Sequence, residues 1–310
     1  MKIHLSAKRL VTLSTLLSLS LLTTLSFARS FSLPPSDESI IGKVQHKYVS
    51  GERVSMIAHA FNLGQNAMMA ANPGTPDNGY IRGDSITVPT KYMLPPLDRR
   101  GIIINLPEMR MYYFPKGSNL VMTYPIGIGK IGKTIPVAHS ASITRKVVNP
   151  HWTPPEDIRD FNRAQGIELP KTMGPGPDNP LGPYAIYLSI PTYLIHSTIF
   201  PESIGTRASF GCIRMNEDDI KEFFPAVTPG TPVVVIDMPN KINWQKKHLY
   251  MESHPPLEEN SQDATFANVV ANIDNQTSAT KPALVNWQMV AFLSEHPDGI
   301  PHDIGMTVKR

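Results

Sequence analysis

One cysteine and a histidine upstream of it are the residues best suited to chemistry in this chain. Cys212 is the single thiol among 310 residues, and it lies in the run Ser209-Phe210-Gly211-Cys212-Ile213-Arg214. A nearby cation and a helix amino terminus both lower the pKa of a thiol from its usual value of about 8.5, which raises the thiolate fraction. His196 lies sixteen positions upstream, at the end of an expected strand, where its imidazole can act as a base. The pattern predicts a Cys–His nucleophilic site.

Simpler explanations of the same residues stand beside this one. A lone cysteine is often a small buried hydrophobe, and most histidines are surface residues or polar groups with satisfied hydrogen bonds. A papain-like peptidase fits less well, because its cysteine precedes its histidine in the chain. No two of the ten histidines form a His-Glu-x-x-His pair, and one cysteine excludes intramolecular disulfides and cysteine-rich metal sites. The sequence therefore predicts no metal and no cofactor.

Neither nucleotide binding nor nucleic-acid binding is expected of this chain. Gly127, Gly129 and Gly132 match the spacing of a dinucleotide-binding loop. This match is rejected, because Pro136 follows before a helix can form. The net charge of +3 is also too small to suggest a track for a phosphate backbone. Nucleic acid is not expected as a partner.

The first 28 residues are predicted to be a cleaved signal peptide. Lys2, Lys8 and Arg9 precede an uncharged stretch, 10–27, and Ser26-Phe27-Ala28 places small residues where a signal peptidase reads them. An uncleaved membrane anchor is the alternative, since the stretch reaches the lower limit for a spanning helix. Cleavage removes three basic residues and no acidic one, so the mature chain is formally neutral (26 minus 26).

The mature chain divides by composition into three parts. Residues 41–90 show a strand, two short helices and a second strand, closed by Pro89. Residues 100–238 are rich in β-type runs, with a proline-rich stretch, 150–183, that we expect to be an ordered loop covering the domain. The one clear helix is expected over 216–224, with Asn216 as its N-cap. Residues 239–310 form a C-terminal extension whose run 282–295 is expected to be amphipathic. The predicted strands of the middle part are 102–106 and 110–114 as a hairpin, then 121–128, 142–148, 184–190, 192–195 and 233–236.

The first of these parts resembles a LysM module. The resemblance rests on Tyr48-Val49-Ser50-Gly51-Glu52, Ile57-Ala58-x-x-Phe61, Asn72-Pro73 and Gly83-Asp84-Ser85-Ile86-x-Val88-Pro89. The departure is Arg53-Val54, where Ser/Thr-Leu is more usual. LysM modules bind glycans that contain N-acetylglucosamine, such as peptidoglycan. A small structural domain without a ligand is the alternative.

The middle part resembles the L,D-transpeptidase catalytic domain family. The resemblance rests on His196-Ser197-Thr198 followed by Ser209-x-Gly211-Cys212-x-Arg214, and it runs from about Gly101 to Asp237. Phe210 stands where a polar residue is more usual, and Ser197 stands where glycine is common. The resemblance implies a mainly β fold: a β-sandwich-like catalytic domain preceded by a small βααβ module.

The family resemblance also implies a reaction. Cys212 attacks the carbonyl of the third residue of a peptidoglycan stem tetrapeptide, releases D-Ala and forms a thioester, with His196 as the base. Backbone N–H groups of Phe210, Gly211 and Cys212 are the expected oxyanion donors, each worth about 3–4 kcal/mol of barrier. Arg214 is expected to bind a substrate carboxylate or to brace its loop. Ser197 and Ser209 are expected to bind substrate or to support the site.

Several outcomes of this chemistry stay open at the level of sequence. A stem-peptide amine as acceptor gives a 3-3 cross-link, and an outer-membrane protein amine gives attachment of that protein to the wall. Water as acceptor makes the enzyme an L,D-carboxypeptidase or endopeptidase. A non-catalytic protein that only binds peptidoglycan is a third hypothesis. The expected location is the periplasm, in association with the cell wall.

Overall fold

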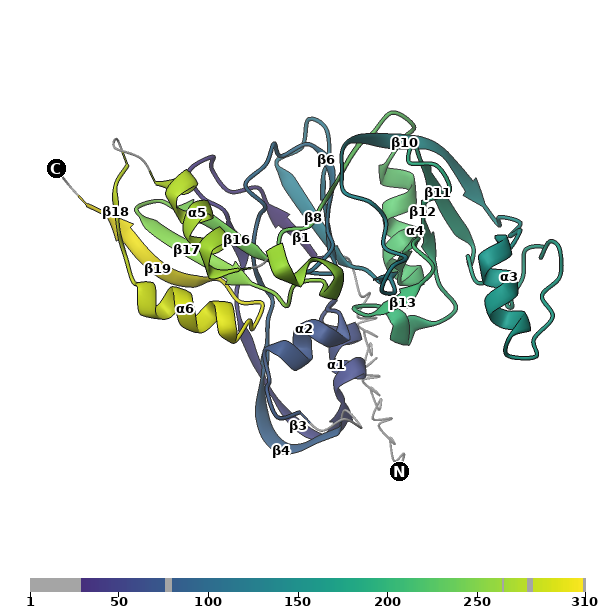
Figure 1. The fold of residues 1–310 in the computed structure, drawn as a ribbon, viewed down its shortest axis with the longest axis horizontal. Coiled ribbons are helices and arrows are strands. Elements are labelled where there is room, and N and C mark those ends of the chain that lie inside the picture. Colours follow the sequence, from purple (N-terminus) through teal and green to yellow (C-terminus); the bar gives the residue numbers. More distant parts are fainter. Residues whose placement is uncertain (1–28, 76–79, 264, 278–280, 309–310) are drawn as a thin grey trace, which may run out of the picture.

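The computed structural model describes residues 29–75, 80–263, 265–277 and 281–308. The predicted signal peptide lies outside the described residues. Figure 1 shows a large sheet in the centre and right of the molecule, a βααβ unit below it and the C-terminal extension at the left. Among the described helices, none has the length and apolar character needed to cross a membrane.

The central sheet has nine strands in the order β1-β8-β7-β6-β15-β10-β11-β12-β14. Most neighbouring strands are antiparallel, whereas β15 pairs with β6 in parallel and β12 pairs with β14 in parallel. The predicted hairpin is present as β6 and β7. The strands are β1 (Arg29–Ser32), β6 (Gly101–Asn105), β7 (Arg110–Phe114), β8 (Leu120–Pro125), β10 (Ala138–Val148), β11 (Tyr184–Leu188), β12 (Leu194–Ser197), β14 (Ile213–Met215) and β15 (Pro232–Ile236).

The central strands β6 and β7 are buried on both faces, and their successive residues alternate between two cores. Ile102 and Ile104 of β6 pack into a core that includes residues of the helix α4 (Glu217–Ala226), whereas Ile103 packs into a second core. Tyr113 and Tyr112 of β7 alternate in the same way. Side chains of a strand point to opposite faces in turn, so a run without polar residues is what a doubly covered strand requires.

The second core is shared between the sheet and the βααβ unit. Val54, Ile57 and Met68 of the unit pack in one cluster with Ile103 and Tyr112 of the sheet. The order of elements agrees with the expected strand, two helices and strand, and β3 pairs with β4 in antiparallel register. The βααβ unit therefore does not stand apart from the central sheet but covers one of its faces. Its elements are β3 (Gln45–Arg53), α1 (Val54–Ala60), α2 (Gln65–Ala70) and β4 (Tyr80–Val88), flanked by the paired strands β2 (Ile40–Gly42) and β5 (Lys91–Met93).

The proline-rich segment between β10 and β11 contains a helix that the sequence analysis does not anticipate. This helix is α3 (Glu156–Arg163), and Pro155 precedes it as the N-cap residue. Proline at a helix start is compatible with helical geometry, so a high proline content hides a short helix of this kind. The backbone groups of Trp152 and Met173 exchange hydrogen bonds of 2.8 and 2.7 Å and close the base of the segment. Two short strands, β9 (Ile128–Gly129) and β13 (Arg207–Ser209), pair in parallel nearby, and the 3-10 helix η1 spans Pro201–Ser203.

The C-terminal extension forms a four-stranded sheet in the order β16-β17-β19-β18, with its own core against two helices. The expected amphipathic helix over 282–295 is only partly correct. Leu284 lies in a strand and is 69% exposed, and the helix begins after Asn286, whose side chain accepts a hydrogen bond from Met289 N. The elements are β16 (Asn240–Gln245), β17 (His248–Ser253), the 3-10 helix η2 (Glu258–Asp263), α5 (Phe266–Gln276), β18 (Ala283–Val285), α6 (Trp287–Glu295) and β19 (His302–Thr307).

Candidate active site

The register of two parallel strands places His196 and Arg214 on one face of the sheet. His196 of β12 lies beside Arg214 of β14, and Ile195 lies beside Ile213. Both isoleucines point into the core, so His196 and Arg214 lie on the opposite face. Cys212 lies two residues before Arg214, in the turn that leads into β14, and the charge of Arg214 acts on the pKa of both Cys212 and His196. Strand pairing thus sets the imidazole beside the guanidinium, and the thiol lies at the entry to the second of these strands.

A tight turn before β14 presents the thiol, and Ser209 braces this turn. Ser209 Oγ donates to Cys212 O at 2.7 Å and accepts from Gly211 N at 3.0 Å. Gly211 has φ +119, and a Cβ there would lie 2.7 Å from Lys133 O and from the Tyr193 ring. Only glycine fits this position. The expectation that Gly211 N–H is available to an oxyanion is not met, because Ser209 accepts its hydrogen bond.

The thiol faces a strained turn that the sequence analysis misses. Tyr193 N donates to Ile190 O at 3.2 Å, with Pro191 and Thr192 between them. Thr192 has φ +71, which is rare for a β-branched residue and resembles the third position of a type II turn, where glycine is usual. Cys212 Sγ lies 3.9 Å from Thr192 O, the acceptor of its S–H. The Ile-Pro-Thr-Tyr run signals a turn, but nothing in it signals the position of this carbonyl.

His196 is buried, and a backbone carbonyl fixes its tautomer. His196 Nδ1 lies 2.5 Å from Ser197 O, and since a carbonyl only accepts, Nδ1 carries the proton. Nε2 is then the nitrogen that can accept a proton. Burial and the positive charge of Arg214 lower the pKa of His196 to about 4. The imidazole is therefore neutral at neutral pH.

The charge state of the thiol reflects two opposing influences. Burial raises the pKa of Cys212 above its usual value, and a hydrogen bond from the Leu194 backbone and the charge of Arg214 partly offset this rise. The resting site therefore holds a neutral thiol and a neutral imidazole. In this state the nucleophile becomes charged only as it loses its proton to a base.

Arg214 is held mainly through its backbone. Arg214 N and O pair with Gly127 O and N, each at 2.9 Å, and its guanidinium lies 5.7 Å from the centre of the Phe200 ring. The Nε atom is buried and makes no hydrogen bond within the described part of the chain. Burial lowers the pKa of Arg214, and the charges of Cys212 and Glu202 act in the opposite direction. A buried donor without a partner beside a reactive thiol suits an anionic substrate group.

Ser197 supports the site from beneath. It is fully buried, and its Oγ accepts from Tyr184 N and donates to Leu181 O, both at 3.0 Å. A Cβ on Gly182 would lie 2.6 Å from Ser197 Oγ, so the neighbouring loop approaches closely. These contacts fix the Ser197 carbonyl, which in turn orients His196. They favour a supporting role for Ser197 over substrate binding.

The βααβ unit contacts the loop that follows β12. A Cβ on Gly64 would lie 2.6 Å from Gly205 Cα, and Gln65 N lies 3.5 Å from Ile204 O. The backbones of the two parts are therefore in direct contact. A cavity of about 400 Å³ lies between α1 and this loop, with Met56, His59, Glu202 and Asn216 in its lining. The sequence offers no sign of this contact, since 141 positions separate the two glycines (205 minus 64).

A buried charge cluster lies where the three parts of the chain meet. Lys241 Nζ lies 2.8 Å from Glu108 and 2.6 Å from Glu252, and all three side chains are at most 2% exposed. His254 Nε2 lies 2.7 Å from Glu252. Glu108, Glu252 and His254 form a set of metal-ligand types that the sequence analysis does not foresee. The ammonium already bonds both carboxylates, so a cation there would have to displace it.

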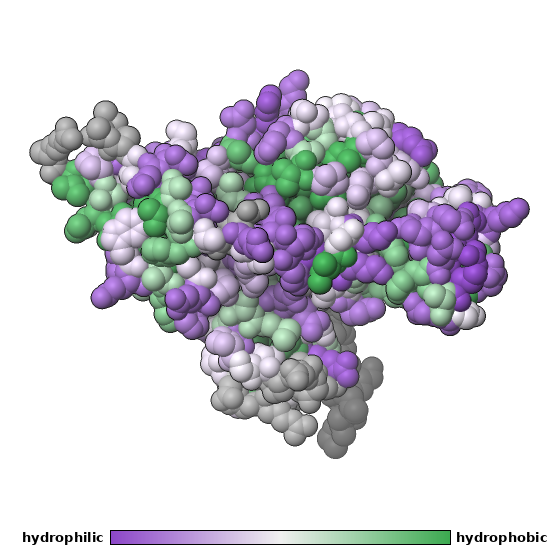
Figure 2. Space-filling view, in the orientation of Figure 1, coloured by the Kyte–Doolittle hydropathy of each residue, from purple (hydrophilic) through white to green (hydrophobic). Residues whose placement is uncertain are grey.

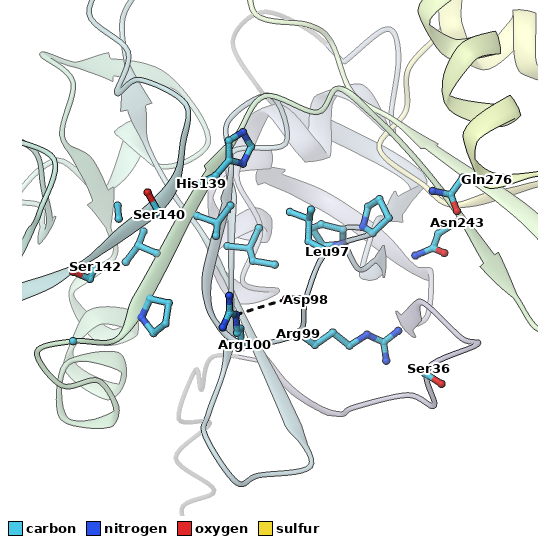
Figure 3. Close-up of a pocket in the computed structure, with 18 residues that line it drawn as sticks. Ser36, Leu97, Asp98, Arg99, Arg100, His139, Ser140, Ser142, Asn243 and Gln276 are labelled. Carbon is cyan, nitrogen blue, oxygen red and sulfur yellow. Dashed lines mark ion pairs between the residues drawn. The ribbon is translucent and has the colours of Figure 1, made fainter.

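An open cavity of about 820 Å³ lies between the central sheet and the C-terminal extension (Figure 3). Its lining contains none of the predicted catalytic residues. Arg100 and Asp98 form an ion pair of 3.8 Å beside it, and Arg99 donates to the carbonyls of Pro34, Pro35 and Glu38. Volume alone therefore does not identify the catalytic site in this molecule.

Comparison with known proteins identifies the family. A family model described as the L,D-transpeptidase catalytic domain matches residues 99–235. The chain is 38% identical to the probable L,D-transpeptidase YcfS of Escherichia coli over 283 residues, which cover 89% of this chain and 88% of the relative. It is 37% identical to the probable L,D-transpeptidase YbiS of the same organism, over 74% of this chain and 76% of the relative. An NMR structure of the catalytic domain of the E. faecium L,D-transpeptidase is 20% identical, covers 46% of this chain and 99% of its own, and has a TM-score of 0.34. This chain belongs to the L,D-transpeptidase family.

Proposed function

We propose that this protein is a peptidoglycan L,D-transpeptidase in which Cys212 is the nucleophile and His196 the base. The observation that carries the proposal is the strand register that sets His196 beside Arg214, with Cys212 in the turn two residues before Arg214. The donor is a stem tetrapeptide that ends in a diamino acid and D-Ala. The products of the first half-reaction are a thioester on Cys212 and free D-Ala.

The attack on the donor begins from neutral partners. As Cys212 Sγ approaches the donor carbonyl, its proton passes to His196 Nε2, which the Ser197 carbonyl leaves free. The S–C bond forms, the amide C–N bond breaks, and the leaving D-Ala amine takes the proton from the imidazolium. Because the pKa of His196 is about 4, the imidazolium returns this proton readily.

The tetrahedral intermediate carries a negative charge on the former carbonyl oxygen. The backbone N–H groups of Cys212 and Phe210 are the proposed donors to this oxygen, and Gly211 is left out because it donates to Ser209. Each donor of this kind contributes about 3–4 kcal/mol to lowering the barrier. Arg214 is proposed to bind a carboxylate of the substrate through its buried guanidinium.

An amine then resolves the thioester. The amine nitrogen attacks the thioester carbon, the C–S bond breaks, and His196 carries the amine proton to the departing sulfur. A stem-peptide amine gives a 3-3 cross-link, and an outer-membrane protein amine gives attachment to the wall. Water in the same role gives a trimmed tripeptide, and this hydrolase is the second candidate function.

The remaining parts of the chain suit a protein that acts on the cell wall. We infer that residues 1–28 direct export to the periplasm and are then cleaved. The βααβ unit is proposed to be a LysM module that binds the glycan strand. Its direct contact with the loop after β12 would then keep the glycan at a fixed place relative to Cys212.

Mass spectrometry of products and protein tests the proposal. The mature chain is incubated with a tetrapeptide donor, and an acyl adduct on Cys212 is expected together with a cross-linked dimer or a protein adduct. Cys212→Ala is expected to abolish both, and His196→Gln is expected to slow adduct formation by at least about 100-fold. Cys212→Ala with unaltered products would refute the catalytic role, and a tripeptide as the single product would identify the hydrolase.

A further inference from the structure

The helix α3 lies outside the hydrophobic cores of the molecule. None of its residues is buried, and Phe161 on it is 46% exposed. The end of the molecule that carries α3 is mainly hydrophilic on the face that Figure 2 shows. Burial of apolar surface therefore does not fix the position of this helix, and its few specific contacts must do so.

Three side chains hold α3 to the body, and we name them the aromatic latch: Lys130, Phe161 and Phe210. The rings of Phe161 and Phe210 meet edge to face, with centres 5.2 Å apart and planes at 73°. Lys130 Nζ lies 3.8 Å from the centre of one ring and 3.7 Å from the centre of the other. A second contact is the exposed ion pair of Lys133 with Asp157 at 2.7 Å. An exposed ion pair and an exposed cation–π contact each contribute about 1 kcal/mol or less, and the latch adds the contact between its two rings.

The latch is built on the turn that carries the nucleophile. Phe210 precedes Cys212 by two residues, and Lys130 N donates to Ser209 O at 3.0 Å. Lys133 O lies against Gly211. Phe161 of α3 therefore rests on the turn that carries Cys212, and a movement of α3 away from the body separates it from Phe210 and Lys130.

We propose that the aromatic latch holds α3 closed at the Cys212 turn and thereby directs the thioester toward an amine rather than water. Lys130 and Phe161 are positioning residues in this role. The inference rests on the proposed function, because it concerns the fate of the thioester. In transfer, the C–N bond forms and the C–S bond breaks. In hydrolysis, a water oxygen forms the new bond to carbon, and the product is a carboxylic acid. A closed site excludes the water that competes with the bound amine.

The aromatic latch depends on phenylalanine at position 210. A polar residue at this position would leave Lys130 only the Phe161 ring to contact. With phenylalanine, one ammonium contacts two rings from different segments at once. This double contact is lost when the rings separate, so it links the position of the helix to the turn that carries Cys212.

The test measures two quantities for each variant with the mature full chain, tetrapeptide donor and an amine acceptor. The first is the rate of acyl adduct formation on Cys212, and the second is the ratio of amine-transfer product to tripeptide. Lys130→Met and Phe161→Ala are expected to change the rate of acyl adduct formation by no more than about twofold. They are expected to lower the ratio of amine-transfer product to tripeptide by about three- to tenfold. Lys130→Arg is expected to retain the ratio, since a guanidinium also stacks on rings.

Matched controls are available in the C-terminal extension. Lys281→Met removes an ammonium that lies 3.9 Å from the Trp244 ring centre, and Phe292→Ala removes a ring that stacks on His296. Neither is expected to change the ratio. An unchanged ratio in both latch variants, or an equal change in the controls, overturns the latch. Absence of any acyl adduct in the native protein instead overturns the proposed function, so the two failures are distinguishable.

Discussion

The Lys241 cluster gives the strongest stability prediction. Lys241→Met removes the ammonium that lies within 2.8 Å of two carboxylates, both at most 2% exposed. It also removes the hydrogen bonds from Nζ to Met93 O and the Tyr112 hydroxyl. Breaking a buried pair by deleting one partner costs about 3–5 kcal/mol, because the charge that remains has lost its compensation. At about 2–3 °C per kcal/mol for a chain of this size, the unfolding midpoint should fall by roughly 6–15 °C.

The stability lost in Lys241→Met should depend on pH in a defined direction. Burial raises the pKa of Glu108, but the charges of Lys241 and His254 outweigh it, and the net pKa lies below the usual value. A carboxyl with a lowered folded pKa stabilises above the unfolded pKa, and this stability is lost as pH falls through the folded pKa. Without Lys241 the burial effect prevails, the pKa of Glu108 rises, and the carboxyl can fold protonated in mild acid. The difference between variant and native protein should therefore be larger at pH 8 than at pH 5.

Urea unfolding at the two pH values, followed by circular dichroism, measures this difference. Lys47→Met is the matched control, since its ion pair with Glu52 is about one-third exposed on both sides and should cost less than about 1 kcal/mol. Adding Glu252→Gln to Lys241→Met should recover part of the loss, because one uncompensated charge disappears. A loss no greater than that of Lys47→Met, or one that grows toward pH 5, would refute the reasoning.

Three further predictions concern the active site and its supports. The rate of adduct formation should fall in acid with a midpoint near pH 4, the pKa of His196. Arg214→Met should move this midpoint toward pH 6.5, because it removes a charge that lowers the pKa of His196. A stopped-flow pH series in which the midpoint does not move would contradict this. Thr192→Gly should raise the free energy of unfolding by about 1 kcal/mol, because glycine adopts the positive φ at this position without strain. The rate of adduct formation should change little, and a lower urea midpoint would count against this prediction. Gly64→Ala should lower the free energy of unfolding by about 1–3 kcal/mol, because the new Cβ would meet the Gly205 backbone. The φ of Gly64, −77°, is an ordinary value for alanine, so backbone strain adds nothing. Hydrogen exchange at residues 204–206 should rise, and unchanged exchange would exclude the contact.

Local patterns in the sequence predict much of this fold. The β-rich runs 102–106 and 110–114 identify the hairpin of β6 and β7, and the spacing of Val54, Ile57 and Ala58 identifies α1. Short-range signals are sufficient there, because neighbouring residues make the defining contacts. The helix expected from 216 is also present, although Asn216 donates its side-chain amide to Asp219 instead of capping a backbone N–H.

Other features depend on contacts between distant residues, and the sequence does not reveal them. The Lys241 cluster joins positions more than 100 apart, and no local pattern distinguishes these charges from solvated ones. The positive φ of Thr192 is imposed by the turn around it and opposes the preference of a β-branched residue. Cys212 and His196 were recognisable by residue type and order, whereas the commitment of Gly211 N–H to Ser209 follows from the turn geometry alone.

The core shared by the βααβ unit and the central sheet has a consequence for how the chain is made. The unit occupies residues 45–88, but its apolar face rests on Ile103, Tyr112 and Ile236. A ribosome delivers these residues in order, so the first-made part keeps an uncovered apolar face until β15 has been synthesised. The apolar face of the unit is therefore fully covered only once residue 236 of 310, about three-quarters of the polypeptide, has been made. Until then the unit needs shielding against aggregation, by a chaperone or by retention in an unfolded state.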